Sequence, residues 1–158
     1  MRKKIFITIS IFVFILLDII SSRYIFSFSI KPNWWLIFTL FCALFIGHTE
    51  AVVVGFICGT ILDILHMEIF GLYAITLSTI GYFFGLFYKK IDETLTKVQI
   101  IILFSGSVIN FLLYVLLTKF FFLPLGYSNN ILLLPLLDTF IGFFVFKALI
   151  YFYELYNY

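Results

Sequence analysis

Apolar residues occur along this chain in long, nearly unbroken runs. The first run covers Ile5 to Ile20, and a longer block extends from Trp34 to Leu65 with one polar break at Gly47-His48-Thr49-Glu50. An α-helix needs roughly 20 apolar residues to cross a bilayer, so this length and pattern leave room for about six spans. The broken block then becomes a tight hairpin of two short spans. The predicted spans are residues 5–22, 34–47, 50–65, 69–88, 98–118 and 131–153.

The composition places these helices in lipid. Of the 158 residues, 64% are hydrophobic and 11% are charged, and the mean hydropathy is +1.19. A soluble domain usually carries about 25% charged residues, so a soluble enzyme is excluded. The formal net charge of +2 is too small to indicate a nucleic-acid partner. The sequence therefore predicts one all-α, polytopic integral membrane domain over residues 1–158.

The basic residues divide unevenly between the two sides that six spans define. Lys and Arg concentrate in cytoplasmic loops, so both termini are predicted to be cytoplasmic. One long bent helix over residues 34–65 would remove this bias, whereas a re-entrant hairpin would keep it and stays open as an alternative. On the predicted inner side lie Arg2, Lys3, Lys4, Lys89, Lys90, Lys97 and, by snorkelling, Lys147; on the outer side lie Arg23, Lys31 and Lys119.

Three local features refine this map. The basic start also fits a signal peptide, but residues 18–23 lack a small-x-small cleavage site, so we expect a retained first helix. Trp34 and Trp35 fall at a predicted outer boundary, where aromatic rings with one polar edge are favoured. Cys42 and Cys58 lack metal-ligand spacing and are interpreted as packing residues.

The third predicted span carries a stripe of small residues that ends in a carboxylate. Gly55, Gly59 and Asp63 follow at intervals of four, a spacing that rotates each residue by only about 40° around a helix. Small residues at this spacing let another helix backbone approach closely. We favour a structural role for Asp63, in which it ties this span to a neighbour or caps a helix end. The alternative is that Asp63 binds a ligand or a proton. His66, three residues on, is within reach of it.

The fourth predicted span repeats the small-residue pattern with Gly81 and Gly85, and Gly71 stands at its entrance. The third and fourth spans are therefore predicted to form the packed centre of the protein. The fifth and sixth spans, rich in Phe and Leu, are predicted to form its periphery.

Other polar groups near the spans have ordinary interpretations. Asp138 follows Pro135 and is predicted to serve the first turn of a helix that starts late. Asp18 is predicted to reach the outer interface near Arg23. His48 and Glu50 are predicted to stay wet in the hairpin turn, and Asn110 could bond across helices.

The nearest enzymatic alternative, an intramembrane aspartyl peptidase, needs two carboxylates that share a proton. No Asn-x-Gly or similar polar neighbourhood surrounds the acids, and P-loop, H-E-x-x-H and G-x-S-x-G motifs are absent from the sequence. We expect no enzyme and assign no catalytic, cofactor-binding or metal residue.

Residues 32–85 carry an order of features that resembles a known family. Pro32-Asn33 leads into an apolar helix, GFICGTILDIL holds Gly55, Gly59 and Asp63, and IFGLYAITLSTIGYFFG holds Gly71, Gly81, Tyr82 and Gly85. This order resembles the bacterial rod shape-determining protein MreD family, which typically shows Pro-Asp before the second span, a G-x-x-x-G-x-x-x-D segment and a later Gly-Tyr. The sequence departs from that pattern at Asn33, where Asp is common, and at His66-Met67-Glu68, where a small polar turn is usual. The resemblance covers about a third of the chain, and residues 98–158 match only in hydropathy.

The resemblance implies a non-enzymatic subunit of the cell-elongation machinery in the bacterial cytoplasmic membrane, without a cofactor. Its partner would be an MreC-like membrane protein and, through it, MreB filaments and peptidoglycan synthases; a homodimer is compatible with it. The family is similar in architecture to the substrate-binding components of energy-coupling-factor transporters. That similarity supports a compact six-helix fold and supplies the alternative function, a transporter component that binds a vitamin or metal. The residues expected to contact a neighbouring span or a partner helix are Gly55, Gly59, Asp63, Gly71, Gly81, Tyr82 and Gly85, with Pro32 at the hairpin entry.

Overall fold

The computed structural model describes residues 2–21, 32–66, 70–92, 94–121 and 133–157, which form helices joined by turns. It confirms the predicted all-α fold of six helices. The chain turns back at Gly47, whose φ of +149° ends the second helix and separates it from the third. The elements are α1 (Arg2–Ile20), α2 (Trp34–Phe41) with its π-helical continuation η2 (Cys42–Ile46), α3 (His48–His66), α4 (Leu72–Gly85), α5 (Thr96–Phe120) and α6 (Leu133–Asn157).

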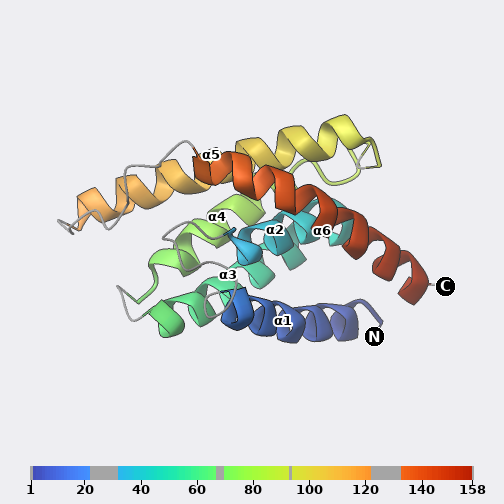
Figure 1. Ribbon diagram of the computed structural model, residues 1–158, viewed down its shortest axis with the longest axis horizontal. Helices are drawn as coiled ribbons and strands as arrows, with labels where there is room; N and C mark the ends of the chain where they lie inside the picture. Colours follow the sequence, from blue (N-terminus) through green and yellow to red (C-terminus); the bar gives the residue numbers. More distant parts are fainter. Residues whose placement is uncertain (1, 22–31, 67–69, 93, 122–132, 158) are drawn as a thin grey trace.

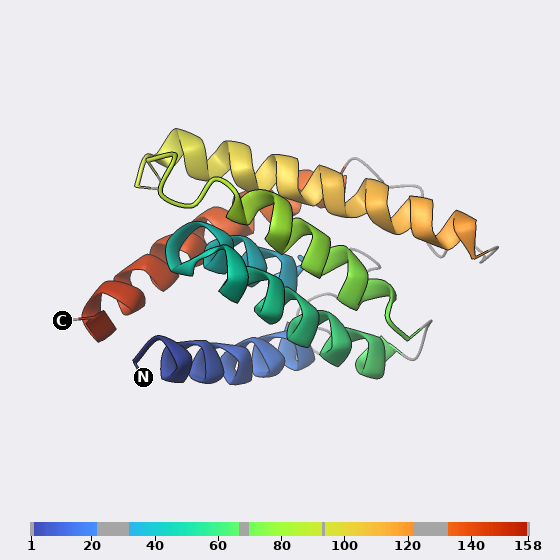
Figure 2. The ribbon, with the colours of Figure 1, turned by 180° about the vertical axis from the view of Figure 1, so that it is seen from behind.

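Successive helices run in opposite directions along the long axis of the molecule, so both termini lie at the same end (Figures 1 and 2). We call this end the basic end, because Lys89, Lys90 and Lys97 are exposed there, between α4 and the first turn of α5. We call the opposite end, where α2, α4 and α6 begin, the capped end, for reasons given below.

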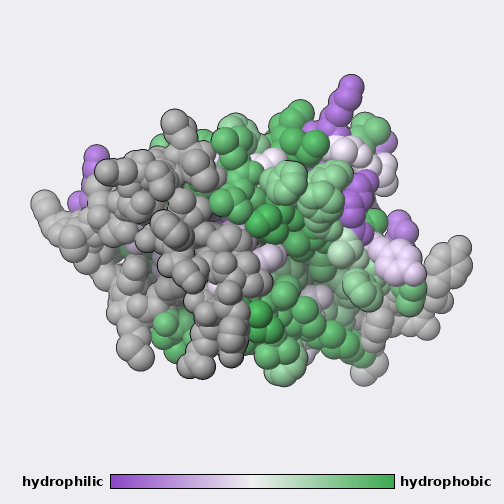
Figure 3. Space-filling model, in the orientation of Figure 1, coloured by the Kyte–Doolittle hydropathy of each residue, from purple (hydrophilic) through white to green (hydrophobic). Residues whose placement is uncertain are grey.

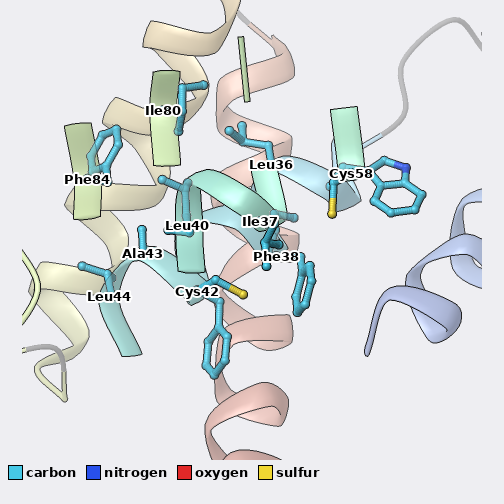
Figure 4. Packing of buried hydrophobic residues seen from close by; sticks show 14 of the residues in the cluster. Leu36, Ile37, Phe38, Leu40, Cys42, Ala43, Leu44, Cys58, Ile80 and Phe84 are labelled. Carbon is cyan, nitrogen blue, oxygen red and sulfur yellow. The ribbon is translucent and has the colours of Figure 1, made fainter. Parts of the chain in front are cut away.

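The centre of the bundle is α2 together with η2. Every residue from Trp35 to Leu44 is buried, and Figure 4 shows their side chains pointing to all sides, towards Cys58 of α3 and Ile80 and Phe84 of α4. A helix that is apolar all round belongs in a core. The prediction that the third and fourth spans form the centre is therefore wrong. Trp35, predicted to lie at an outer boundary, does stand in the first turn of α2, but it is 1% exposed and so packs against protein rather than facing the headgroups.

The other five helices turn large apolar side chains outwards. Phe12, Phe56, Ile101 and Phe140 are each more than half exposed, Phe56 at 58% and Phe140 at 68%. Figure 3 shows apolar side chains across the middle of one face, with hydrophilic ones gathered towards the ends. So much exposed apolar surface fits a lipid surrounding rather than water.

The helices differ in length. Among the described residues, three stretches are long and apolar enough to cross a membrane, and three further apolar helices are shorter. At 1.5 Å per residue, α4 and the α2–η2 segment are each only about 20 Å long, against a hydrocarbon layer of about 30 Å. The longer stretches are His48–Leu65, Thr96–Phe120 and Leu134–Leu155; the shorter helices are Ile5–Ile20, Trp34–Ile46 and Leu72–Gly85.

Five aromatic rings join α1, α2, η2 and α6 near the basic end. The Phe41 ring lies 5.8 Å from that of Phe146 and 6.0 Å from that of Tyr153, both edge-on, and 4.8 Å from that of Phe45, stacked. The Phe6 ring meets Tyr153 edge-on at 5.3 Å. Edge-on and offset rings add about 0.5–1.5 kcal/mol per pair beyond the area they bury. The last third of α6 is thereby fixed against the start of α1.

Candidate functional site

Four glycines bring the backbones of α3 and α4 into contact. A Cβ added to Gly55 would lie 2.6 Å from the carbonyl oxygen of Leu77, and one added to Gly59 would overlap the Ala74 backbone. Real Cβ atoms do not approach backbone atoms so closely, so only glycine fits at these positions.

The relation is reciprocal on the other helix. A Cβ on Gly81 would lie 2.6 Å from the carbonyl oxygen of Ala51, and one on Gly85 would lie 2.8 Å from the Cα of His48. Two glycines of α3 thus receive the α4 backbone, and two glycines of α4 receive the α3 backbone. Lipid gives apolar helices no hydrophobic drive to associate, so close van der Waals packing of this kind is what holds them together. We call these four residues the glycine interface.

Asp63 stands at the capped end of the glycine interface and caps α4. Its Oδ2 accepts hydrogen bonds from the backbone N–H groups of Gly71 at 3.0 Å and Ala74 at 3.2 Å, and its Oδ1 accepts one from Tyr73 at 2.9 Å. The first N–H groups of a helix have no partner within the helix. Because Asp63 is 3% exposed, water is not the alternative partner there.

Gly71 explains why the cap comes from another helix. It is the N-cap residue of α4, where a side chain ordinarily accepts from the second or third helical N–H. Gly71 has no side chain, and its φ of +101° is a conformation that favours glycine. The Asp63 side chain on α3 therefore caps α4 from a neighbouring helix, as a Ser or Asp at the N-cap position would do within one helix.

A second buried carboxylate, Asp138 of α6, serves α2 in the same way. Its Oδ1 accepts the backbone N–H of Asn33 at 2.8 Å, and its Oδ2 accepts the hydroxyl of Ser107 on α5 at 2.5 Å. Asp138 is 4% exposed. The prediction that it serves the first turn of its own helix is wrong, because α6 begins five residues earlier, at Leu133, and its first turn contains no acid.

The start of α2 is tied down by further polar contacts. Asn33 is its N-cap residue, and its side-chain oxygen accepts from the N–H of Leu36 at 3.1 Å. The Trp34 indole N–H donates to the hydroxyl of Ser21 at 2.9 Å, and that hydroxyl donates to the carbonyl of Asp18 at 3.0 Å. The capping role of Asn33 was not predicted, although Asn directly before an apolar run is a common N-cap signal.

The remaining predicted residues lie as follows. Pro32 is buried just ahead of α2, and its carbonyl accepts the Trp34 N–H at 3.1 Å. Tyr82 points away from the glycine interface: it is half exposed, and its ring lies edge-on to that of His48 at 4.8 Å. Asp18, predicted to reach the outer membrane–water interface, is buried inside the protein instead. Arg23, the His66 side chain and Met67-Glu68 lie outside the described residues.

His48 and Glu50 occupy the hairpin turn after η2. Glu50 is exposed, in keeping with the prediction that it stays wet, and it accepts the Thr49 hydroxyl at 2.8 Å. His48 is half-buried rather than fully wet, because its ring lies between Gly85 and Tyr82.

The described residues supply capping groups rather than a metal or redox centre. Among them, no group of three His, Cys, Asp or Glu side chains could hold a metal ion. Cys42 and Cys58 are both buried and free. The chemistry that the arrangement performs is the satisfaction of helix ends inside an apolar layer, where each unpaired backbone group costs several kcal/mol.

Comparison with models of protein families shows which family the chain belongs to. The model of the rod shape-determining protein MreD matches residues 2–157, nearly the whole sequence. The chain belongs to the MreD family. Comparison with curated proteins and with solved structures gave no match. Membership identifies the chain as a rod shape-determining, integral membrane protein. It also extends the resemblance seen at residues 32–85 to the second half of the chain; the likeness to transporter components stays a prediction.

Proposed function

We propose that this MreD-family protein is a non-enzymatic structural subunit of the bacterial cytoplasmic membrane. In this role it holds an MreC-like membrane protein and so links MreB filaments to peptidoglycan synthases. The observation that carries the proposal is the family match over residues 2–157. The engagement of the buried carboxylates Asp63 and Asp138 as helix caps supports a scaffold, since both are occupied in holding α2 and α4.

A partner helix would bind to the lipid-facing sides of the bundle. The face of α3 that carries Gly55 and Gly59 is covered by α4, so it offers no room for a second chain. What remains are the exposed apolar faces of α1, α3, α4, α5 and α6. Loss of the partner in a Gly59→Leu variant would therefore not locate the contact, because the same change disrupts the α3–α4 pair.

Site-specific photocrosslinking in the native cells separates these faces. A photoreactive phenylalanine analogue would replace Phe12, Phe56, Phe83, Leu112 or Phe144, one exposed residue on each face, with buried Phe38 as the matched control. We expect crosslinks to the MreC-like protein from at least one exposed position and none from Phe38. Crosslinks to a second copy of the chain would add a homodimer to the proposal.

Two results would contradict the scaffold. One is the absence of crosslinks at all five exposed positions together with normal cell shape after depletion of the protein. The other is tight co-purification of a vitamin or metal, which would favour the transporter alternative.

The orientation can be tested separately. Exposed Lys89, Lys90 and Lys97 all lie at the basic end, which agrees with a cytoplasmic location for that end and both termini. A green fluorescent protein fused to the C-terminus should fluoresce, and an alkaline phosphatase fusion at the same site should be inactive. The opposite pair of results would invert the orientation without affecting the scaffold.

A further inference from the structure

One lysine lies on the lipid-facing side of a helix rather than in a loop. Lys147 of α6 is exposed, and the exposed rings of Phe140, Phe144 and Tyr151 share its side of the helix at spacings of three and four residues. Its Nζ lies 5.7 Å from the centre of the Phe143 ring. Within the described parts of the chain, no carboxylate forms an ion pair with it. Its ammonium group therefore faces the membrane without a counter-charge from the described residues.

The packing of its neighbours fixes the depth of Lys147. The adjacent residue, Phe146, packs its ring against Phe41 at 5.8 Å and against Phe45 at 6.4 Å, the residues on either side of the first turn of η2. The depth of Lys147 is therefore that of η2, which ends at the turn that leads into α3.

The register against α5 gives the same depth. The antiparallel helices meet where Asp138 bonds Ser107 and where Gly142 contacts Leu103. Counted from the Gly142–Leu103 contact, Lys147 lies five residues further along α6. The residue five positions back along α5 is Val98, the neighbour of Lys97, so Lys147 and Val98 lie at the same level. The backbone of Lys147 thus lies towards the basic end but within the apolar stretch Leu134–Leu155, and its long side chain can extend further towards the headgroups by snorkelling.

We propose that Lys147 binds the phosphate of an anionic phospholipid, with an acyl chain along the exposed Phe140–Phe144 side of α6. Three observations on the page favour lipid over a protein carboxylate. The ammonium group of Lys147 can reach the headgroup region at the basic end by snorkelling, the exposed lysines 89, 90 and 97 at this end enrich anionic lipid around it, and the rings beside it are apolar. Exposed Glu50, Asp92 and Glu154 belong to the same end but form no ion pair with Lys147 among the described residues. This inference rests on the membrane location and not on the proposed scaffold.

Native mass spectrometry of the full-length protein in mild detergent tests the site. The probes are phosphatidylglycerol and, as the zwitterionic reference, phosphatidylcholine. We expect the wild type to retain phosphatidylglycerol preferentially and the Lys147→Gln variant to retain about fivefold less, the change expected for one lysine near an anionic surface. Lys119→Gln removes an exposed lysine from the other end of α5 and should leave retention unchanged.

The variants also show what would overturn the proposal. Lys147→Arg should keep phosphatidylglycerol, because it keeps the charge. Equal retention by Lys147→Gln and wild type, or equal retention of the two lipids by wild type, would refute the site. Displacement of the lipid by inorganic phosphate alone would refute the part played by the acyl chain. A Lys147→Gln variant that loses a co-purifying protein while retaining phosphatidylglycerol would show that the lysine serves a protein partner instead.

Discussion

The two buried carboxylates make an instructive comparison. Asp63 and Asp138 both accept N–H groups at the start of a short helix that begins at the capped end, and both are almost fully buried. Asp63 takes three backbone N–H groups from residues 8 to 11 positions ahead in the chain. Asp138 takes one backbone N–H from 105 positions away and one hydroxyl from 31 positions away.

The difference shows that a carboxyl group can cap the start of a helix from the neighbouring helix of a hairpin, as Asp63 does, or from a helix distant in the sequence, as Asp138 does. The Asp63 cap completes a hairpin whose two helices already touch through glycine. The Asp138 cap joins three helices, α2, α5 and α6, that large side chains hold apart. We therefore expect loss of Asp63 to destabilise one hairpin strongly and loss of Asp138 to loosen the arrangement of the bundle.

The largest effect should come from the glycine interface itself. Gly59→Leu places a side chain against the Ala74 backbone, which cannot give way, so we expect a loss of about 3 kcal/mol or more in the free energy of unfolding. Unfolding of the purified protein in mixed micelles, followed by circular dichroism, measures it. Gly106→Ala is the matched control, because its Cβ meets only the flexible methyl groups of Leu40. Equal losses in the two variants would contradict the backbone contact.

Removal of the first carboxylate should come next. Asp63→Ala leaves three N–H groups at the start of α4 without an acceptor, and we expect a loss of about 2–3 kcal/mol, since a lost cap and the buried donors add together. Asp63→Asn keeps one acceptor oxygen and should lose about half as much. Faster hydrogen exchange of the Tyr73 and Ala74 amides would show that the effect lies at the helix start. Unchanged exchange there would argue against the cap.

Removal of the second carboxylate should cost less. Asp138→Ala frees a single backbone N–H, that of Asn33, while the side chain of Asn33 still caps Leu36, so we expect about 1–2 kcal/mol. The same unfolding measurement applies. A loss larger than that of Asp63→Ala would reverse the ranking and show that the contact across the bundle matters more than the hairpin.

The smallest effect should be that of Ser107→Ala. It removes one side-chain hydrogen bond between α5 and α6, and such bonds inside membranes average about 0.6 kcal/mol. In a double-mutant cycle with Asp138→Ala, the two changes should not be additive, because they share a single contact. Additive losses would mean that the hydroxyl and the carboxylate act independently.

Some of the site could be predicted from the sequence, because it depends on residues close together in the chain. Gly55, Gly59 and Asp63 share one helix, so a spacing of four is enough to align them on one face, and Gly81 and Gly85 repeat the pattern on the next helix. Which helix fills that face cannot be read from spacing. The sequence left both a neighbouring span and a partner helix open, and the structure places α4 there.

The errors share a physical origin. Trp35 and the rest of α2 are apolar, and apolar residues suit lipid and protein interior equally well, so composition could not tell a central helix from a peripheral one. Asp138 was interpreted from its neighbour Pro135 in sequence, whereas its bonding partners belong to other helices.

The sequence by itself determined that this protein is helical and lies in lipid, because hydropathy and helix spacing are properties of consecutive residues. It also determined that α3 and α4 carry faces on which another backbone can lie. Only the tertiary structure decided that α2 is the core and that each buried carboxylate completes the start of a different helix. The reason is that hydrogen-bond partners in an apolar layer are selected by distance in space, and in the bundle that distance is unrelated to separation along the chain.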